Sequence, residues 1–186
     1  MGMVKLTGGE GKRKNIKVPK GIRPTRGIVK RSIFDTLRDE VRDASVLEIF
    51  AGSGAVGFEA LSRGALSCVF IEKSREGTLS ILENAKSLGF KDKVRIIKAD
   101  FVRALNELVR EGAKFDIIFA DPPYDFKLHE EIFKRIVFLL NPEGLYIVEV
   151  RNKTQLPDVF EKLRKIKEAN FGQTKIVYYR MLSGDL

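Results

Sequence analysis

Four residues near the middle of the chain, Asp121, Pro122, Pro123 and Tyr124, have the types and spacing needed to hold a flat, polar substrate. They follow the apolar run 115–120, which reads as a strand buried on both faces. Neither proline can donate to a strand ladder, so the strand must end in a stiff turn. The Asp121 carboxylate and nearby carbonyls can accept hydrogen bonds from an amino group, and the Tyr124 ring can stack. A proline-terminated strand with a surface tyrosine is the alternative, but the full string favours a catalytic site.

A second candidate site lies at a glycine-rich turn. Gly52, Gly54 and Gly57 follow the apolar run 46–50 in the spacing G-x-G-x-x-G. Glycines let a backbone approach a ligand closely, and the N-terminus of the following helix offers free N–H groups. Glu72, 20 residues after Gly52, ends the next predicted strand, where a carboxylate can accept from ribose hydroxyls. By itself this pattern fits NAD as well as S-adenosylmethionine.

Two further acids help to separate these ligands. Glu48 lies inside the strand before the glycine turn, where it would repel a pyrophosphate and favour a cationic amino acid moiety. Asp100 ends a third predicted strand, next to Phe101, whose ring can cover an adenine. Three acids at successive strand ends favour a positively charged, amine-bearing nucleoside. The alternative for Glu72 is a salt bridge with Lys73 or a neighbouring cation, and the alternative for Asp100 is an N-cap of the helix that begins at Phe101. Asp100 can both cap this helix and bind a ligand.

Strand-like and helix-like segments alternate along the chain, which predicts a mostly parallel α/β sheet with helices on both faces. This sheet would have to position the candidate residues. We expect a helix from about Arg26, capped by Thr25, and an antiparallel last strand, since no crossover helix fits before it. The predicted strands are 46–50, 67–71, 94–98, 115–120, 145–150 and 174–182. The other predicted helices are 57–63, 76–88, 101–110, 128–140 and 156–165.

Positive charge is concentrated at the N-terminal end of the chain. The net charge is +9, and residues 1–31 hold ten Lys and Arg against one acid, so the remainder is neutral. A neutral body with a cationic arm indicates a polyanion partner, and a basic tail that aids solubility is the alternative. We expect residues 1–22 to form a loose hairpin or to become ordered only on RNA, and residues 23–186 to form the catalytic domain.

Composition excludes several other classes of protein. The chain has no 18-residue apolar run and its first residues are basic and polar, so we expect neither a transmembrane helix nor a signal peptide. The single cysteine, Cys68, excludes an intramolecular disulfide, fits a reducing cytoplasm and lies in a strand-like run where we expect it buried. The only histidine, His129, argues against a histidine-based metal site, and we expect no metal.

The chain resembles class I S-adenosylmethionine-dependent methyltransferases that act on amino groups, in the segments EIFAGSGAVGFEALSRGA, FIEKS, ADF and FADPPY. Two further segments, IRPTRGIVKRSIFDTL and FGQTKIVYYR, make it similar to the bacterial small-subunit (16S) rRNA guanine-N2 methyltransferase family, RsmD, over nearly its whole length. This resemblance implies a Rossmann-like fold with a seven-stranded sheet. It also implies a monomer that acts on an assembled small ribosomal subunit. The opening LTGGEGKRKN departs from the family in containing Glu10.

The resemblance implies a role for each group of candidate residues. The methionine half of the cofactor would be lined by Glu48, Phe50, Ala51, Gly52, Ser53 and Gly54. Glu72, with Lys73 beside it, would hold the ribose, Asp100 and Phe101 would bind the adenine, and Asp121, Pro122, Pro123 and Tyr124 would take the guanine amino group. The RNA would be bound by Lys12, Arg13, Lys14, Arg23, Thr25, Arg26, Lys30 and Arg31.

Three other functions share part of this pattern. A nicotinamide-dependent oxidoreductase would have the glycine turn and Glu72, but it should carry a proton-shuttling side chain and needs no cationic arm. A DNA adenine-N6 methyltransferase usually carries a target-recognition insertion, for which 186 residues leave little space. A non-catalytic RNA-binding protein would have no need of the acids at the strand ends.

Overall fold

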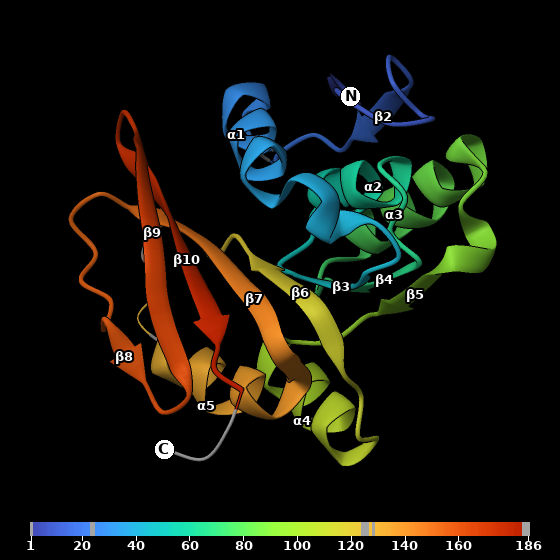
Figure 1. The fold of residues 1–186 in the computed structure, drawn as a ribbon. Coiled ribbons are helices and arrows are strands. Elements are labelled where there is room, and N and C mark those ends of the chain that lie inside the picture. The colour runs from blue at the N-terminus through green and yellow to red at the C-terminus, as the bar shows by residue number, and fades with distance from the viewer. Residues whose placement is uncertain (1, 23–24, 124–126, 128, 184–186) are drawn as a thin grey trace.

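A single large sheet forms the centre of the molecule, and helices cover both of its faces (Figure 1). The computed structural model describes residues 2–22, 25–123, 127 and 129–183. The strands of the sheet are β3 (Ser45–Ile49), β4 (Ser67–Ile71), β5 (Val94–Ile97), β6 (Phe115–Ala120), β7 (Leu140–Arg151), β8 (Val159–Phe160), β9 (Leu163–Phe171) and β10 (Thr174–Met181). The helices are α1 (Gly27–Leu37), α2 (Ala55–Ser62), α3 (Arg75–Leu88), α4 (Phe101–Arg110) and α5 (His129–Leu139), with short 3₁₀ turns at Arg38–Val41 and Lys91–Lys93.

The strand order is β5-β4-β3-β6-β7-β10-β9-β8. The first five strands in this order are parallel, and β10 runs antiparallel to both of its neighbours. The predicted mostly parallel sheet with an antiparallel last strand is therefore confirmed. In the described part of the chain the sheet has eight strands instead of seven, because the two-residue strand β8 pairs with the free edge of β9.

The predicted helix over residues 156–165 is wrong. This segment contains β8 and the beginning of β9, which pairs along its length with β10. Apolar side chains at 156, 159, 160 and 163 have helical spacing, but Leu163 is fully buried in the sheet and the Tyr179 hydroxyl donates to the Pro157 carbonyl. The ladder to β10 supplies backbone hydrogen bonds and burial that a local helix at this edge would lack, so the tertiary context overrides the local pattern.

Each face of the sheet has its own apolar core. Helices α1, α2 and α3 pack on one face, and α4 and α5 pack on the other (Figure 1). Alternate residues of a strand point to opposite faces, so Phe119 of β6 and Ile147 of β7 belong to the first core, whereas Ile118 and Val148 belong to the second. Cys68 is fully buried in the first core, as expected. Among the described residues no helix has the length and apolarity to cross a bilayer.

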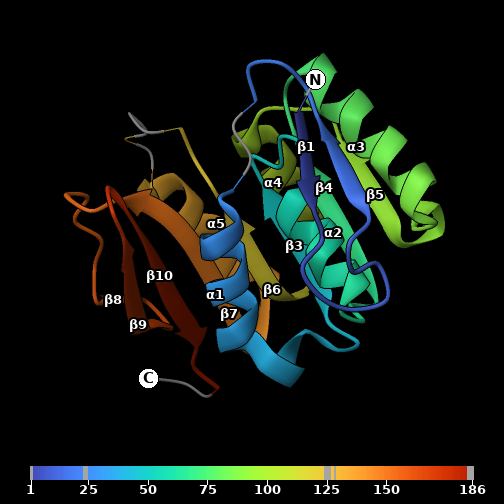
Figure 2. The same cartoon turned by 90° about the horizontal axis from the view of Figure 1, so that it is seen from above.

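The N-terminal arm forms a hairpin that is docked on the body. Strands β1 (Gly2–Lys5) and β2 (Asn15–Val18) pair antiparallel and lie over α2 and α3 (Figure 2). Leu6 and Ile16 are buried in the same core as those helices. The backbone N–H of Lys17 donates to the Asn84 side chain of α3 at 2.9 Å. Of the two arrangements that the sequence left open, the structure shows the hairpin.

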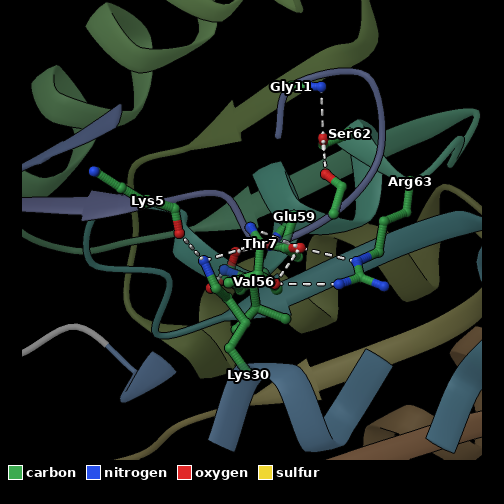
Figure 3. Close-up of polar contacts among 11 residues, drawn as sticks. Lys5, Thr7, Gly11, Lys30, Val56, Glu59, Ser62 and Arg63 are labelled. Atoms are coloured by element: carbon green, nitrogen blue, oxygen red, sulfur yellow. Dashed lines mark hydrogen bonds and ion pairs between the residues drawn. The ribbon is translucent and has the colours of Figure 1, made fainter. Parts of the chain in front are cut away.

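A buried polar network joins the hairpin, α1 and α2 (Figure 3). The Glu59 carboxylate accepts from the backbone N–H of Thr7 at 2.9 Å and from its hydroxyl at 2.8 Å. The same carboxylate pairs with Lys30 at 3.0 Å and with Arg63 at 2.8 Å. The side chains of Lys30 and Glu59 are both fully buried. Gly9 approaches so closely that a Cβ atom would overlap the Ser62 carbonyl oxygen of α2, which only glycine permits.

The start of α1 differs from the sequence prediction. The N-cap residue is Arg26, which makes no side-chain capping bond, so Thr25 does not cap the helix. The Arg26 guanidinium instead donates to the Phe171 carbonyl and to the Thr174 hydroxyl, the latter at 2.9 Å. Arg26 therefore ties the start of α1 to the turn between β9 and β10 instead of leaving it to a local cap.

Candidate active site at the carboxyl edge of the sheet

The glycine turn and the Asp-Pro-Pro corner lie at the ends of neighbouring strands. In the parallel ladder of β3 and β6, Ile49 pairs with Ala120, and the backbone N–H of Asp121 donates to the Ile49 carbonyl at 3.4 Å. Phe50 to Gly54 and Asp121 to Pro123 therefore leave the sheet side by side. Parallel strands lie about 4.8 Å apart, so a ligand on the glycine turn is within reach of the corner.

The glycine turn is held by Glu72. The Glu72 carboxylate accepts from the backbone N–H of Gly52 at 2.8 Å and from that of Ser74 at 2.7 Å. Gly52 and Gly54 have positive φ of 56° and 76°, which favours glycine. These two backbone N–H groups account for the position of the Glu72 carboxylate without a salt bridge to Lys73, which is exposed. Glu72 thus fixes the turn at the strand end where a ribose would lie.

Glu48 is enclosed beneath the turn. Its side chain is buried and accepts from the backbone N–H groups of Gly57 at 2.8 Å and Val56 at 3.4 Å, in the first turn of α2. Burial raises the pKa of Glu48 to about 8, with a further contribution from the nearby Asp121 charge, while the bonds from Gly57 and Val56 act in the opposite direction. Glu48 therefore anchors α2 behind the glycine turn, and its contact with a cofactor stays a prediction.

The raised pKa of Glu48 predicts a specific pH dependence of stability. In the unfolded chain Glu48 loses its proton above its ordinary pKa of 4.5, whereas in the folded protein it keeps the proton up to a pH of about 8. The stability that Glu48 contributes is therefore full below pH 4.5 and is lost as the pH rises to about 8. In Glu48→Gln the contribution is absent. We expect the variant to gain stability relative to the wild type between these pH values, by on the order of 1 kcal/mol or more. Urea unfolding at pH 5, 7 and 9 measures this; a constant difference would contradict it.

Two aromatic rings meet above the next strand ends. The Phe50 and Phe101 rings lie 5.3 Å apart and tilted, which brings the end of β3 against the start of α4. Asp100 caps α4, because its carboxylate accepts from the backbone N–H of Arg103 at 3.1 Å, yet the residue stays exposed. Asp100 is thus free to take part in adenine binding as well, as the sequence suggested. Ala51 and Ser53, by contrast, are buried in the turn.

The Asp-Pro-Pro corner borders a small hollow that the sequence did not reveal. Its described lining residues are Asp121, Pro122, Pro123, His129, Glu149, Val150, Arg151 and Thr154. Burial lowers the pKa of His129, which favours its neutral form. Tyr124 falls outside the described residues. The one sequence signal for this hollow is the carboxylate of Glu149 within the apolar run 145–150, where an acid has no packing role.

The basic residues predicted to bind RNA have different surroundings. Lys12, Arg13 and Lys14 are exposed on the hairpin, and Arg26 and Arg31 are exposed on α1. The prediction that Lys30 contacts RNA does not fit the structure. Helix α1 turns the Lys30 side chain into the core, where it pairs with Glu59 and donates to the Lys5 carbonyl at 2.9 Å. The predicted RNA contact of Thr25 does not fit the structure either, because this residue is largely buried. Arg23 falls outside the described residues.

Comparisons with known proteins agree with this arrangement. A family model described as "Conserved hypothetical protein 95" matches residues 4–180. Ribosomal RNA small subunit methyltransferase D of Escherichia coli is 31% identical over 189 residues, covering 99% of this chain and 93% of that protein. The protein of the same name from Haemophilus influenzae is 31% identical, covering 87% and 82%. The solved structure of yhhF from Escherichia coli has a TM-score of 0.87 and 31% identity, covering 98% of this chain and 100% of that one. With its glycine turn and Asp-Pro-Pro corner side by side, this chain belongs to the ribosomal RNA small subunit methyltransferase D family.

Proposed function

We propose that this protein transfers a methyl group from S-adenosylmethionine to the exocyclic N2 amino group of a guanine in 16S ribosomal RNA. One observation carries the proposal: the turn that would hold the methyl donor and the corner that would hold the amino group end neighbouring strands β3 and β6. We further propose that the substrate is an assembled small subunit, on which the protein acts as a monomer in the cytoplasm.

The residues on β3, β4 and α4 suit S-adenosylmethionine. When bound, this cofactor supplies a methyl group on a sulfonium, which needs no further activation for transfer. Glu72 at the glycine turn would accept from the ribose hydroxyls, and Asp100 with Phe101 would hold the adenine. The Asp121 carboxylate lies close enough to Glu48 to raise its pKa, and it places negative charge near the turn, which favours a cationic ligand over a pyrophosphate. This charge distribution also disfavours the nicotinamide cofactor.

The Asp-Pro-Pro corner would activate the amino group by position. The lone pair of a base amine is delocalised into the ring, so the amine is a weak nucleophile. Hydrogen bonds from its two N–H groups to the Asp121 carboxylate and the Pro122 carbonyl would hold the nitrogen with its lone pair toward the methyl group. The cofactor would supply the methyl group, so that a new N–C bond would form as the S–C bond breaks, and Asp121 or water would take the amine proton. The base must first be turned out of its helix or loop.

The decisive experiment is methylation of unmodified substrate. Small subunits from cells lacking the modification, and naked 16S RNA, are incubated with the protein and labelled S-adenosylmethionine, and the product is mapped by mass spectrometry. We expect N2-methylguanine at one position, with assembled subunits as the better substrate. Label on adenine, or no label on either RNA, would contradict the proposal. Calorimetric titration with S-adenosylmethionine and with NAD tests the cofactor separately.

The exposed cations of the hairpin predict a salt-dependent affinity for RNA. If Lys12, Arg13 and Lys14 each contact a phosphate, replacing all three with Gln should reduce the slope of log affinity against log salt by about 2 to 3. The measurement is subunit binding between 50 and 200 mM salt, about the range over which phosphate contacts are resolved. The control variant replaces Arg110, Lys134 and Arg164, exposed cations on α4, α5 and β9, and changes the net charge equally. Equal slopes for both variants would remove the hairpin from the RNA interface.

A further inference from the structure

Glu149 is a buried carboxylate on the strand next to Asp121. It is 7% exposed and lies in the apolar segment of β7. In the parallel ladder of β6 and β7, Ala120 pairs with Val148, so Asp121, the first residue after β6, and Glu149 of β7 each follow the last pair of this ladder. Both follow the alternation of Phe119 and Ile147 and therefore face the α1 side of the sheet. The two acids line the same hollow beside Pro122.

We propose that Glu149 determines base specificity by accepting a hydrogen bond from the ring N1–H of the target guanine. This inference rests on the proposed guanine-N2 activity, in which Asp121 and the Pro122 carbonyl hold the exocyclic amino group. The N1–H and the 2-amino group are adjacent donors on the Watson–Crick edge of guanine. A pair of acceptors on neighbouring strands at about 4.8 Å spacing is suited to two adjacent donors.

The same carboxylate would exclude adenine. Adenine presents an acceptor, its N1 atom, next to its amino group, and an ionised carboxylate only accepts. A site built to receive an N–H donor rejects a base that offers a lone pair there, because two acceptors would face each other away from water. Enzymes that turn a base out of its helix read the Watson–Crick edge in this way. Glu149 would therefore select guanine over adenine, whereas Asp121 would accept a hydrogen bond from the amino group of either base.

The test changes the N1 position of the base and the side chain of Glu149. In 2-aminopurine the 2-amino group is kept, but N1 is an acceptor. Once the methylated guanine is mapped, RNA carrying 2-aminopurine at that position is compared with normal RNA, using wild type, Glu149→Gln and Glu83→Gln. We expect wild type to lose about 10- to 100-fold in kcat/KM on 2-aminopurine. In Glu149→Gln the amide can donate to N1, so the ratio of 2-aminopurine to guanine activity should rise at least about 10-fold.

The outcomes separate this inference from the proposed function. Glu83 is an exposed acid on α3 whose side chain is 55% exposed, and Glu83→Gln should leave the ratio unchanged. Wild type that methylates 2-aminopurine as fast as guanine overturns the role of Glu149, whether or not Glu149→Gln folds. An unchanged ratio in a folded, cofactor-binding Glu149→Gln does the same, because a merely structural role lowers both activities equally. Wild type that methylates no guanine overturns the proposed function together with this inference.

Discussion

Replacing Asp121 with Ala is expected to lower the rate of methyl transfer by about 100-fold or more while leaving S-adenosylmethionine binding nearly unchanged. Asp121 follows β6, next to the glycine turn, and its backbone bond to Ile49 is unaffected by the substitution. The side chain is the acceptor that would orient the amine, so its loss removes positioning and electrostatic stabilisation of the transition state. The cofactor contacts proposed for Glu72 and Asp100 would lie beyond the ends of other strands, β4 and β5, and would remain.

Single-turnover methylation of unmodified small subunits measures this rate, and calorimetry measures cofactor affinity. Asp92→Asn is the matched control, because Asp92 is an exposed acid in the 3₁₀ turn before β5 and should leave both quantities unchanged. Asp121→Asn keeps one acceptor oxygen and should retain more activity than Asp121→Ala. Full turnover by Asp121→Ala would remove Asp121 from the mechanism, and a parallel loss of cofactor binding would indicate a disturbed site instead.

Replacing Glu59 with Ala is expected to destabilise the protein by about 3 to 5 kcal/mol. Lys30 is fully buried and would lose its ion pair, which leaves an uncompensated charge in the core. The backbone N–H and hydroxyl of Thr7 would lose their acceptor as well, so the hairpin would lose one of its attachments to α2. Urea unfolding measures the stability, and hydrogen exchange at Thr7 measures the docking of the hairpin.

The acid dependence of unfolding gives a second measurement on Glu59. Burial acts to raise its pKa, but Lys30 and Thr7 together hold the pKa below its ordinary value of 4.5. A lowered pKa contributes stability above pH 4.5 that is lost as the pH falls through the folded value, so wild type should lose more stability in acid than Glu59→Ala.

Two further variants separate the buried charge from other effects. Glu83 forms an exposed pair with Lys17 on the same hairpin, and Glu83→Ala should cost no more than about 1 kcal/mol. Adding Lys30→Met to Glu59→Ala removes the unpaired charge and should restore part of the stability. The loss of an exposed ion pair costs no more than about 1 kcal/mol. If the free energy of unfolding of Glu59→Ala lies within about 1 kcal/mol of the wild-type value, the proposed role of this network is contradicted.

The position of Lys30 also limits how the arm can act. A lysine at the start of α1 reads as an RNA contact from the sequence, but α1 presents Lys30 on the same side as Val29 and Ile33, toward the core. Its charge serves the attachment of the hairpin through Glu59. The exposed cations nearby, Arg26 and Arg31, remain the candidates for phosphate contacts on this helix.

The order of strands and helices along the chain as far as β7, and the two candidate sites, could be predicted from the sequence. Those features are local: strand and helix periods repeat within a few residues, Gly52 and Gly54 allow the turn, and Pro122 and Pro123 end β6. The alternation of strands and helices did not predict that β6 pairs with β3 and so sets Asp121 beside Ile49, because β4 and β5 lie between these two strands in the chain.

The conformation of 156–165, the direction of Lys30 and the placement of Asp121 and Glu149 around one hollow became apparent only from the tertiary structure. Each depends on residues far away in the sequence: β10 supplies the ladder that makes β9 a strand, and Glu59 supplies the charge that permits a buried Lys30. Glu149 reaches Asp121 only through the register of β6 and β7. Such contacts leave no local periodicity, because burial and pairing free energies are set by the partner and not by the segment itself.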